Sequence, residues 1–362
     1  MDKTDRLRDY GLAFLLYEHG LGVCGYELIR ELFIFIKLIL NSYLMVQMTN
    51  KKGFSRCGEL YIDRLREEGR YSTAHVYKNA LFSFSVFCGT CNVSFRQITR
   101  ESLRLYGQYL YENGLKLNTI STYMRMLRSI YNRGVEAGNA PFVPRLFHEA
   151  YTGIDVCQKR ALTAAELHRL LFDDPRSERL RRIQDIASLL FQLCGMSFAD
   201  LAHLEKSALE NNILRYNRIK TKTPMSVEVL DSAMVKIDRL RSVRKSQPGC
   251  PDYLLDILCG DKSRKDEKAY REYQSALRWF NNSLKELARA LHLKSPVTSY
   301  TLRHSWATIA KYRGVSIEMI SEALGHKSIK TTQTYLKGFG LEERTEVNKG
   351  NLSYIRNCNV KG

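Results

Sequence analysis

The pattern of apolar and polar positions predicts a mainly helical protein. From residue 54 to residue 139, apolar side chains recur every three to four positions, which is the period of a helix with one buried face. The pattern predicts four helices. The first is marked by Cys57, Leu60, Tyr61 and Leu65, and the second begins at Tyr71. The third is marked by Leu103, Tyr106 and Leu110, and the fourth by the apolar members of residues 118–131.

Two prolines mark the end of this helical region. Pro141 and Pro144 lie within four residues of each other. Proline ends a helix because it removes a helix hydrogen bond and clashes with the preceding turn. We therefore expect a helical domain at 54–145, a linker at 146–158 and a second domain at 159–345.

The second domain is predicted to be mostly helical with one small β element. Thr163 and Glu166 are three residues apart in the order of a helix capping box. Within residues 213–230, two β-leaning runs flank the segment 221–224, which contains proline and indicates a hairpin. The expected fold class is thus mainly α, with a hairpin in the second domain.

The start of the chain forms an extension to which the pattern assigns no role. Residues 1–53 contain an apolar run at 32–46, but Lys37, Asn41 and Ser42 interrupt it. A membrane-spanning helix needs roughly 20 apolar residues, so we expect a helix packed on protein and no membrane partner.

The net charge indicates the class of binding partner, and the cysteines indicate the cellular setting. Lys and Arg number 56 against 38 Asp and Glu, giving a formal charge of +18. This surplus favours a polyanion such as nucleic acid, because each neutralised phosphate releases a counterion. The nine cysteines are scattered through a long chain, which is typical of a reduced, cytoplasmic setting.

Arginines alternate with the apolar positions of the fourth predicted helix. Arg125, Arg128 and Arg133 leave one face free to pack while the other is basic. Such a helix can bind DNA phosphates. A basic face that only contacts solvent is the alternative.

Two segments near the end carry the most specific pattern. They are Ser299–Thr308 and Leu324–Leu336, which include an Arg303-His304 pair and a Leu-Gly-His ending at His326. Here the sequence resembles the tyrosine recombinases, the family of phage integrases and chromosome-dimer resolvases. In that family an Arg-His pair leads a helix and the nucleophilic tyrosine follows the later Leu-Gly-His by nine residues, as Tyr335 follows His326.

The resemblance implies a catalytic set of Tyr335, Arg303, His326 and Lys220. Tyr335 would attack a DNA phosphate, Arg303 and His326 would bind its oxygens, and Lys220, in the hairpin, would protonate the leaving 5′-oxygen. Lys222 is a neighbouring candidate for the lysine. The resemblance implies no metal and no cofactor, because the phosphotyrosine conserves the energy of the broken bond.

Two positions depart from the family pattern. The first box normally reads Thr-Gly-Leu-Arg with an acid three further on, whereas here Ser197 takes the place of the arginine and Asp200 is the acid. Tyr300 stands three before Arg303, where the family usually has histidine. Both features resemble a branch of mobile-element integrases and DNA invertases that lacks the first arginine.

A second cation in the hairpin could compensate for Ser197. Strand side chains alternate with period two, so Arg218 is expected on the same side as Lys220, and Arg215 on the other. A contact of Arg218 with DNA backbone outside the site is the alternative.

The resemblance also implies an assembly. We expect a C-shaped clamp of the two domains around double-stranded DNA, a homotetramer on the recombination site, a tail at 346–362 that docks on a neighbouring protomer, and accessory DNA-bending or directionality proteins as further partners. Integration, excision and inversion stay open, and the lack of a recognisable arm-binding domain favours a simple recombinase. Two other classes also remain, a type IB topoisomerase and a DNA-binding protein without catalysis.

Overall fold

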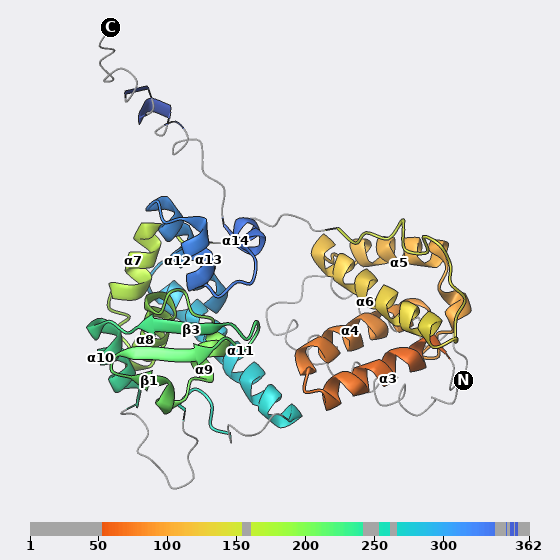
Figure 1. Ribbon diagram of the computed structural model, residues 1–362, viewed down its shortest axis with the longest axis horizontal. Coiled ribbons are helices and arrows are strands. Elements are labelled where there is room, and N and C mark those ends of the chain that lie inside the picture. Colours follow the sequence, from red (N-terminus) through yellow and green to blue (C-terminus); the bar gives the residue numbers. More distant parts are fainter. Residues whose placement is uncertain are drawn as a thin grey trace, which may run out of the picture. The chain divides into compact units, whose positions relative to one another are not determined.

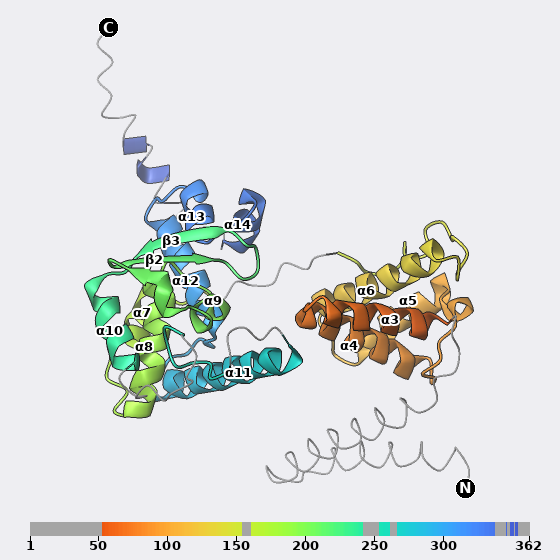
Figure 2. The same cartoon turned by 60° about the horizontal axis from the view of Figure 1, so that its bottom comes forward.

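The computed structural model divides into two compact units near residue 155, which are drawn in Figures 1 and 2. No helix in the described part is long and apolar enough to cross a membrane. The extension before residue 53, with its apolar run, and most of the tail lie outside the described residues. Those residues are 53–153, 161–241, 253–260, 266–336, 345, 348–350 and 352–353.

The first unit is the predicted helical domain. Its core is formed by apolar side chains of four helices, with a short 3₁₀ helix, η1, between the second and third. These elements are α3 (Phe54–Glu67), α4 (Tyr71–Phe87), η1 (Phe95–Gln97), α5 (Arg100–Glu112) and α6 (Leu117–Glu136).

The predicted faces are confirmed for α5 and α6 and partly wrong for α3. Leu103, Tyr106 and Leu110 are buried along α5, which begins after a capping box at Thr99. In α3, however, Leu60 is 53% exposed. The buried side of that helix follows Phe54, Gly58, Ile62 and Leu65, one step round the helix from the predicted face.

The core of the first unit continues past the expected domain end at residue 145. Leu146, Phe147 and Ala150 are buried against it, and the Tyr131 ring lies edge-on to the Phe147 ring. The first half of the predicted 146–158 linker is therefore part of this domain's packing. The helix itself ends at Glu136, before either proline. Apolar side chains in a loop bury as readily as those in a helix, so the domain continues past the end of α6.

The described helices and strands of the second unit pack around a larger core that is built mainly on α8 and α11. Thr163 and Glu166 form the predicted capping box at the start of α7. The helices are α7 (Ala164–Phe172), α8 (Glu178–Gln192), α9 (Phe198–Ala202), η2 (Lys206–Ala208), α10 (Asp231–Arg241), α11 (Glu267–Ala290), α12 (Ser299–Tyr312), α13 (Ile317–Ala323) and α14 (Ile329–Tyr335), besides the sheet.

The predicted hairpin is present and belongs to a three-stranded antiparallel sheet in the order β1-β2-β3. The strands are β1 (Leu209–Glu210), β2 (Ile213–Asn217) and β3 (Pro224–Glu228). Leu214 and Val227 pair across β2 and β3 and are buried in the core, which leaves the neighbouring Arg215 exposed.

Strand alternation ends earlier than the sequence pattern predicted. The last pair of the ladder is Asn217 with Pro224, and residues 218–223 form the connecting loop. Arg218 is 6% exposed, whereas Lys220 is exposed, so the period-two argument that placed them on one face was wrong.

Candidate active site

Arg303 is the most deeply buried cation of the site. Its side chain, on α12, is 2% exposed, and its guanidinium donates hydrogen bonds to the carbonyls of Gly195 (2.8 Å) and Leu324. Carbonyls carry only partial charges, so they orient this guanidinium without neutralising it. A planar cation held in this way is suited to binding two oxygens of one phosphate.

His326 lies beside Arg303 and is fixed from the opposite side by α14. Its Nε2 is 3.5 Å from Nη2 of Arg303, and its Nδ1 is 2.9 Å from Oγ1 of Thr332, which is fully buried. A threonine hydroxyl can donate or accept, so either neutral tautomer of the imidazole is satisfied at Nδ1.

The surroundings of His326 favour its neutral form. Burial and the nearby cations Arg303, Arg218 and Lys220 lower its pKa from 6.5 to about 4. The same cations would attract a phosphate dianion or diester at this point. At neutral pH the imidazole is therefore uncharged and acts as a hydrogen-bond donor or acceptor.

This low pKa predicts a pH-dependent stability. Between pH 6.5 and about 4 the unfolded chain binds a proton at His326 that the folded chain does not, so the free energy of unfolding should fall as the pH falls through this window. Urea unfolding at pH 7 and pH 5 measures the loss, and His326→Gln should lose less stability than wild type between these two values. Parallel losses in both proteins would contradict the assignment.

Tyr335 is the last residue of α14, and its backbone is held on both sides. Thr332 contacts His326 one helical turn earlier. Leu336, the next residue, is buried with Ala307 and Leu324 in a small cluster formed by α12, α13 and the end of α14. The position of the side chain of Tyr335 lies outside what the structure describes. Its backbone belongs to α14, the helix whose Thr332 contacts His326.

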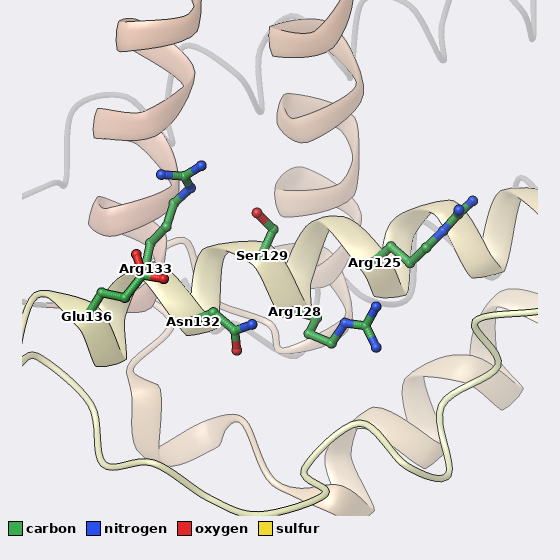
Figure 3. A pocket seen from close by; sticks show the side chains of 6 residues that line it. All are labelled: Arg125, Arg128, Ser129, Asn132, Arg133 and Glu136. Carbon is green, nitrogen blue, oxygen red and sulfur yellow. The ribbon is translucent and has the colours of Figure 1, made fainter. Parts of the chain in front are cut away.

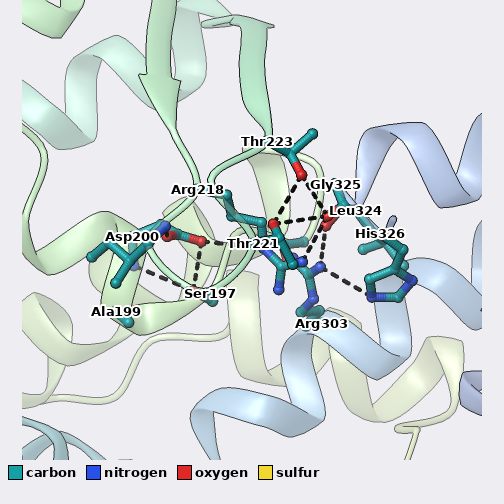
Figure 4. Close-up of polar contacts among 12 residues, drawn as sticks. Ser197, Ala199, Asp200, Arg218, Thr221, Thr223, Arg303, Leu324, Gly325 and His326 are labelled. Carbon is teal, nitrogen blue, oxygen red and sulfur yellow. Dashed lines mark hydrogen bonds and ion pairs between the residues drawn. The ribbon is translucent and has the colours of Figure 1, made fainter. Parts of the chain in front are cut away.

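Arg218, in the hairpin loop, contacts the turn formed by Leu324, Gly325 and His326 between α13 and α14. Its Nη1 donates to the Gly325 carbonyl at 3.0 Å, and its Nε is 3.6 Å from Oδ2 of the buried Asp200 (Figure 4). Gly325 has φ +62°, and a Cβ there would lie 2.9 Å from Cδ of Arg218 and 2.7 Å from Sδ of Met225. Glycine is required at this position both for its conformation and for the approach of Arg218.

Ser197, which the sequence predicts at the place of the family's first arginine, is a helix cap. Its Oγ accepts from the backbone N–H of Asp200 at 3.2 Å and donates to the Asp200 carboxylate at 2.7 Å. Asp200 also accepts from the backbone N–H of Ile219 at 2.8 Å. The carboxylate thus links the start of α9 to the hairpin loop.

The other predicted residues lie at the surface of the second unit. Lys220 and Lys222 are exposed in the hairpin loop, and the charge of Lys220 is the last and smallest of the causes that lower the pKa of His326. Tyr300 is 53% exposed in the first turn of α12, and its ring packs edge-on against His304, with 5.1 Å between the ring centres.

The sequence did not indicate the threonines that contact His326 and the Gly325 carbonyl. Thr332 is fully buried, and Thr221 and Thr223 contact the Gly325 carbonyl. The available signal was weak: three threonines between residues 331 and 334 precede the tyrosine, more hydroxyls than a surface helix needs.

The chain matches models of two domains in the order found here. One is the "Phage integrase SAM-like domain", over residues 54–145, and the other is the "Phage integrase family", over residues 160–339. Tyrosine recombinase XerD of Pseudomonas aeruginosa is 24% identical over 278 residues, which are 73% of this chain and 86% of the relative.

Two solved structures share the fold. A lambda integrase dimer bound to a COC′ core site has a TM-score of 0.59 at 15% identity and covers 78% of this chain and 95% of that one. A lambda integrase tetramer bound to a Holliday junction has a TM-score of 0.53 at 14% identity and covers 77% of each chain. With both domain models matched in succession, this chain belongs to the phage integrase family of tyrosine recombinases.

Proposed function

We propose that this protein is a site-specific recombinase that cuts and rejoins double-stranded DNA through a covalent link to Tyr335. The proposal rests on one observation: Arg303 and Arg218 both donate to carbonyls of the turn that contains His326. Through its contact with Thr332, His326 links this turn to the helix that ends at Tyr335. Fixed donors around one point are what a phosphodiester needs as negative charge builds on its oxygens.

The reaction conserves bonds and protons. The Tyr335 hydroxyl gives up its proton to water as its oxygen forms a bond to phosphorus and the bond from phosphorus to the 5′-oxygen breaks, leaving a 3′-phosphotyrosine and a free 5′-hydroxyl. Lys220 gives the proton that the 5′-oxygen takes up, and religation reverses both transfers. Because the energy of the bond is stored, no metal or nucleotide cofactor is needed.

The remaining donors bind the phosphate during this exchange. Arg303 offers its planar fork to two nonbridging oxygens, and His326 gives one further hydrogen bond. Tyr300, at the position usually taken by histidine, is 53% exposed, and in this proposal its hydroxyl donates to the same phosphate or its neighbour. In this proposal Arg218 supplies part of the charge that Ser197 does not.

Covalent trapping tests the function directly. A DNA duplex nicked just beside the cleavage point loses its short 5′-hydroxyl fragment, so an adduct accumulates and is seen on a denaturing gel. An adduct on target DNA supports strand cleavage and excludes a DNA-binding protein without catalysis. Relaxation of a supercoiled plasmid that lacks the target site, at the same protein concentration, would instead indicate a type IB topoisomerase.

We propose that the first domain binds DNA through α6. Arg125 and Arg128 are exposed and border a surface cavity of about 260 Å³ on this helix (Figure 3). Arg133 differs, because its guanidinium lies 3.5 Å from the centre of the Tyr61 ring and its Nε is buried. Of the three predicted arginines, Arg125 and Arg128 are therefore the better phosphate ligands, and Arg133 contributes to packing.

The double variant Arg125→Ala/Arg128→Ala should weaken binding to all DNA sequences alike. The slope of log affinity against log salt should become shallower by about 0.9 per lost contact, because fewer counterions are released. Fluorescence anisotropy over a salt series measures this slope. Arg104→Ala, which removes an exposed arginine paired with Glu101 at 2.7 Å on α5, serves as the control. An unchanged slope in the double variant would show that these arginines only contact solvent.

The assembly follows from the relatives as a proposal. Lambda integrase has been seen as a dimer on a core site and as a tetramer on a Holliday junction. We infer a homotetramer on paired recombination sites for this chain, with both domains on the DNA, the 346–362 segment docked on a neighbouring protomer, and a cytoplasmic, nucleoid-associated location. DNA-bending or directionality proteins would decide between integration, excision and inversion.

A further inference from the structure

The loop that carries Lys220 is closed by two of its own backbone hydrogen bonds. The Arg218 N–H donates to the Thr223 carbonyl at 2.8 Å, and the Lys222 N–H donates to the Arg218 carbonyl at 2.7 Å. Lys222 takes the left-handed conformation, with φ +58°, which turns the chain back toward β3. Lys220 lies at the exposed end of this loop, where backbone motion is usually largest.

Two threonine hydroxyls attach the loop to the turn that carries His326. Thr221 Oγ1 donates to the Gly325 carbonyl at 3.2 Å. Thr223 Oγ1 donates to Thr221 Oγ1 at 2.9 Å and is itself 3.4 Å from the same carbonyl (Figure 4). The bond from Thr221 is the shorter of the two to Gly325, so Thr223 mainly orients its partner.

A third contact holds the loop on the other side of Lys220. The backbone N–H of Ile219 donates to Oδ1 of Asp200, whose side chain is 3% exposed. A hydrogen bond to a buried carboxylate is stronger than one between neutral groups. The residues immediately before and after Lys220 are therefore both fixed to parts of the site, one to Asp200 and one to the Gly325 carbonyl.

We propose that Thr221 is a positioning residue for Lys220. Its hydroxyl latches the hairpin loop onto the Gly325 carbonyl, next to His326, so that the lysine is held near the phosphate position before DNA binds. Thr223 supports the latch by fixing the direction of the Thr221 hydroxyl. This inference rests on the proposed function, in which Lys220 protonates the leaving 5′-oxygen.

The test separates proton donation from the other steps of cleavage. Single-turnover cleavage is measured at saturating protein on two nicked substrates, one ordinary and one with sulfur in place of the bridging 5′-oxygen. A thiolate leaves without a proton, so a defect confined to the general acid disappears on the sulfur substrate. Lys220→Ala should be strongly slowed on the oxygen substrate and restored on the sulfur one.

Thr221→Val keeps the shape of threonine but removes its hydroxyl. It should cleave the oxygen substrate about five- to tenfold more slowly, the factor that corresponds to one lost hydrogen bond, and the sulfur substrate within about twofold of wild type. Thr221→Ser, which retains the hydroxyl, should restore the oxygen rate. Ser226→Ala removes an exposed hydroxyl from β3 of the same hairpin and should match wild type on both substrates.

Each outcome decides a different point. If Lys220→Ala is not restored by sulfur, Lys220 is not the acid and the latch falls with that role. If Lys220→Ala is restored while Thr221→Val equals wild type on oxygen, the function stands and the latch is wrong. Thr221→Val slowed equally on both substrates would mean that the threonine supports the fold of the site and not the proton donor, which also overturns the latch.

Discussion

Tyr335→Phe should bind its target DNA as tightly as wild type and form no covalent adduct. The change removes only the oxygen that attacks phosphorus, and phenylalanine keeps the volume of the ring. The helix end should be undisturbed, because its anchors are the contact of Thr332 with His326 and the buried Leu336. Binding and chemistry should therefore separate completely in this variant.

The measurement combines a binding isotherm with adduct trapping on the nicked duplex. Tyr312→Phe is a matched control, since Tyr312 is a partly exposed tyrosine at the far end of α12, 42% exposed. It should give adduct at the wild-type rate. Any phosphotyrosyl link formed by Tyr335→Phe would mean that another of the 21 tyrosines is the nucleophile.

The helices of the first domain were predictable because their burial is periodic. Leu103, Tyr106 and Leu110 lie on one face of α5 whatever that face contacts, so spacing alone identified them. Which side chain from another helix an arginine of α6 contacts was not predictable from the sequence. Arg133 lies over the ring of Tyr61, a residue 72 positions earlier, and no local pattern distinguishes it from Arg125 or Arg128, which remain exposed.

The hairpin shows where a local rule stops applying. The sequence continues to alternate beyond Asn217, yet the ladder ends where Asn217 faces Pro224. The Arg218 N–H still donates to the Thr223 carbonyl, but the Arg218 carbonyl accepts from the Lys222 N–H within the loop, and the pairing ends there. The loop then places Arg218 inward and Lys220 outward, an arrangement set by Asp200 and Gly325 and so by tertiary contacts.

The residues of the site could be located from the sequence only through the family resemblance. Arg303 and His326, 23 positions apart, come within 3.5 Å, and the roles given to them and to Tyr335 and Lys220 stay predictions. The supporting residues carried no motif. Thr332 and Thr221 act through single hydroxyls whose partners are set by the fold, and a threonine at either position looks like many others in the chain.

Arg218→Ala should slow strand cleavage at least about tenfold, since one lost donor to a developing oxyanion costs roughly a hundred- to a thousandfold in other enzymes. Asp200 gives the physical reason to expect a catalytic role. Three residues after Ser197, this acid would accompany the family's first arginine, and here it lies 3.6 Å from Nε of Arg218. In the proposed function, Arg218 is thus the cation beside the acid of the first box.

The burial of Arg218 also argues against the alternative that it contacts DNA backbone outside the site. Its side chain is 8% exposed, and its guanidinium is directed to the Gly325 carbonyl beside His326. After burial and Arg303, its charge is a further cause of the low pKa of His326. A phosphate bound there would lie within reach of both guanidinium groups.

The assay is cleavage of the nicked substrate at saturating protein, where weaker DNA binding does not lower the rate. Arg218→Gln keeps a polar donor near Asp200, where Nε of Arg218 lies, but no charge, and should be slowed like Arg218→Ala. Arg215→Ala, on the exposed face of β2, should cleave near the wild-type rate. Ser197→Ala should lose about 1 kcal/mol of stability with its helix cap, yet cleave normally below its melting temperature, because Asp200 keeps its contacts with Ile219 and Arg218. Equal rates for Arg218→Ala and wild type would remove Arg218 from the mechanism, and a slow Arg218→Ala beside a normal Arg218→Gln would assign it a structural role beside Asp200 instead of a charge.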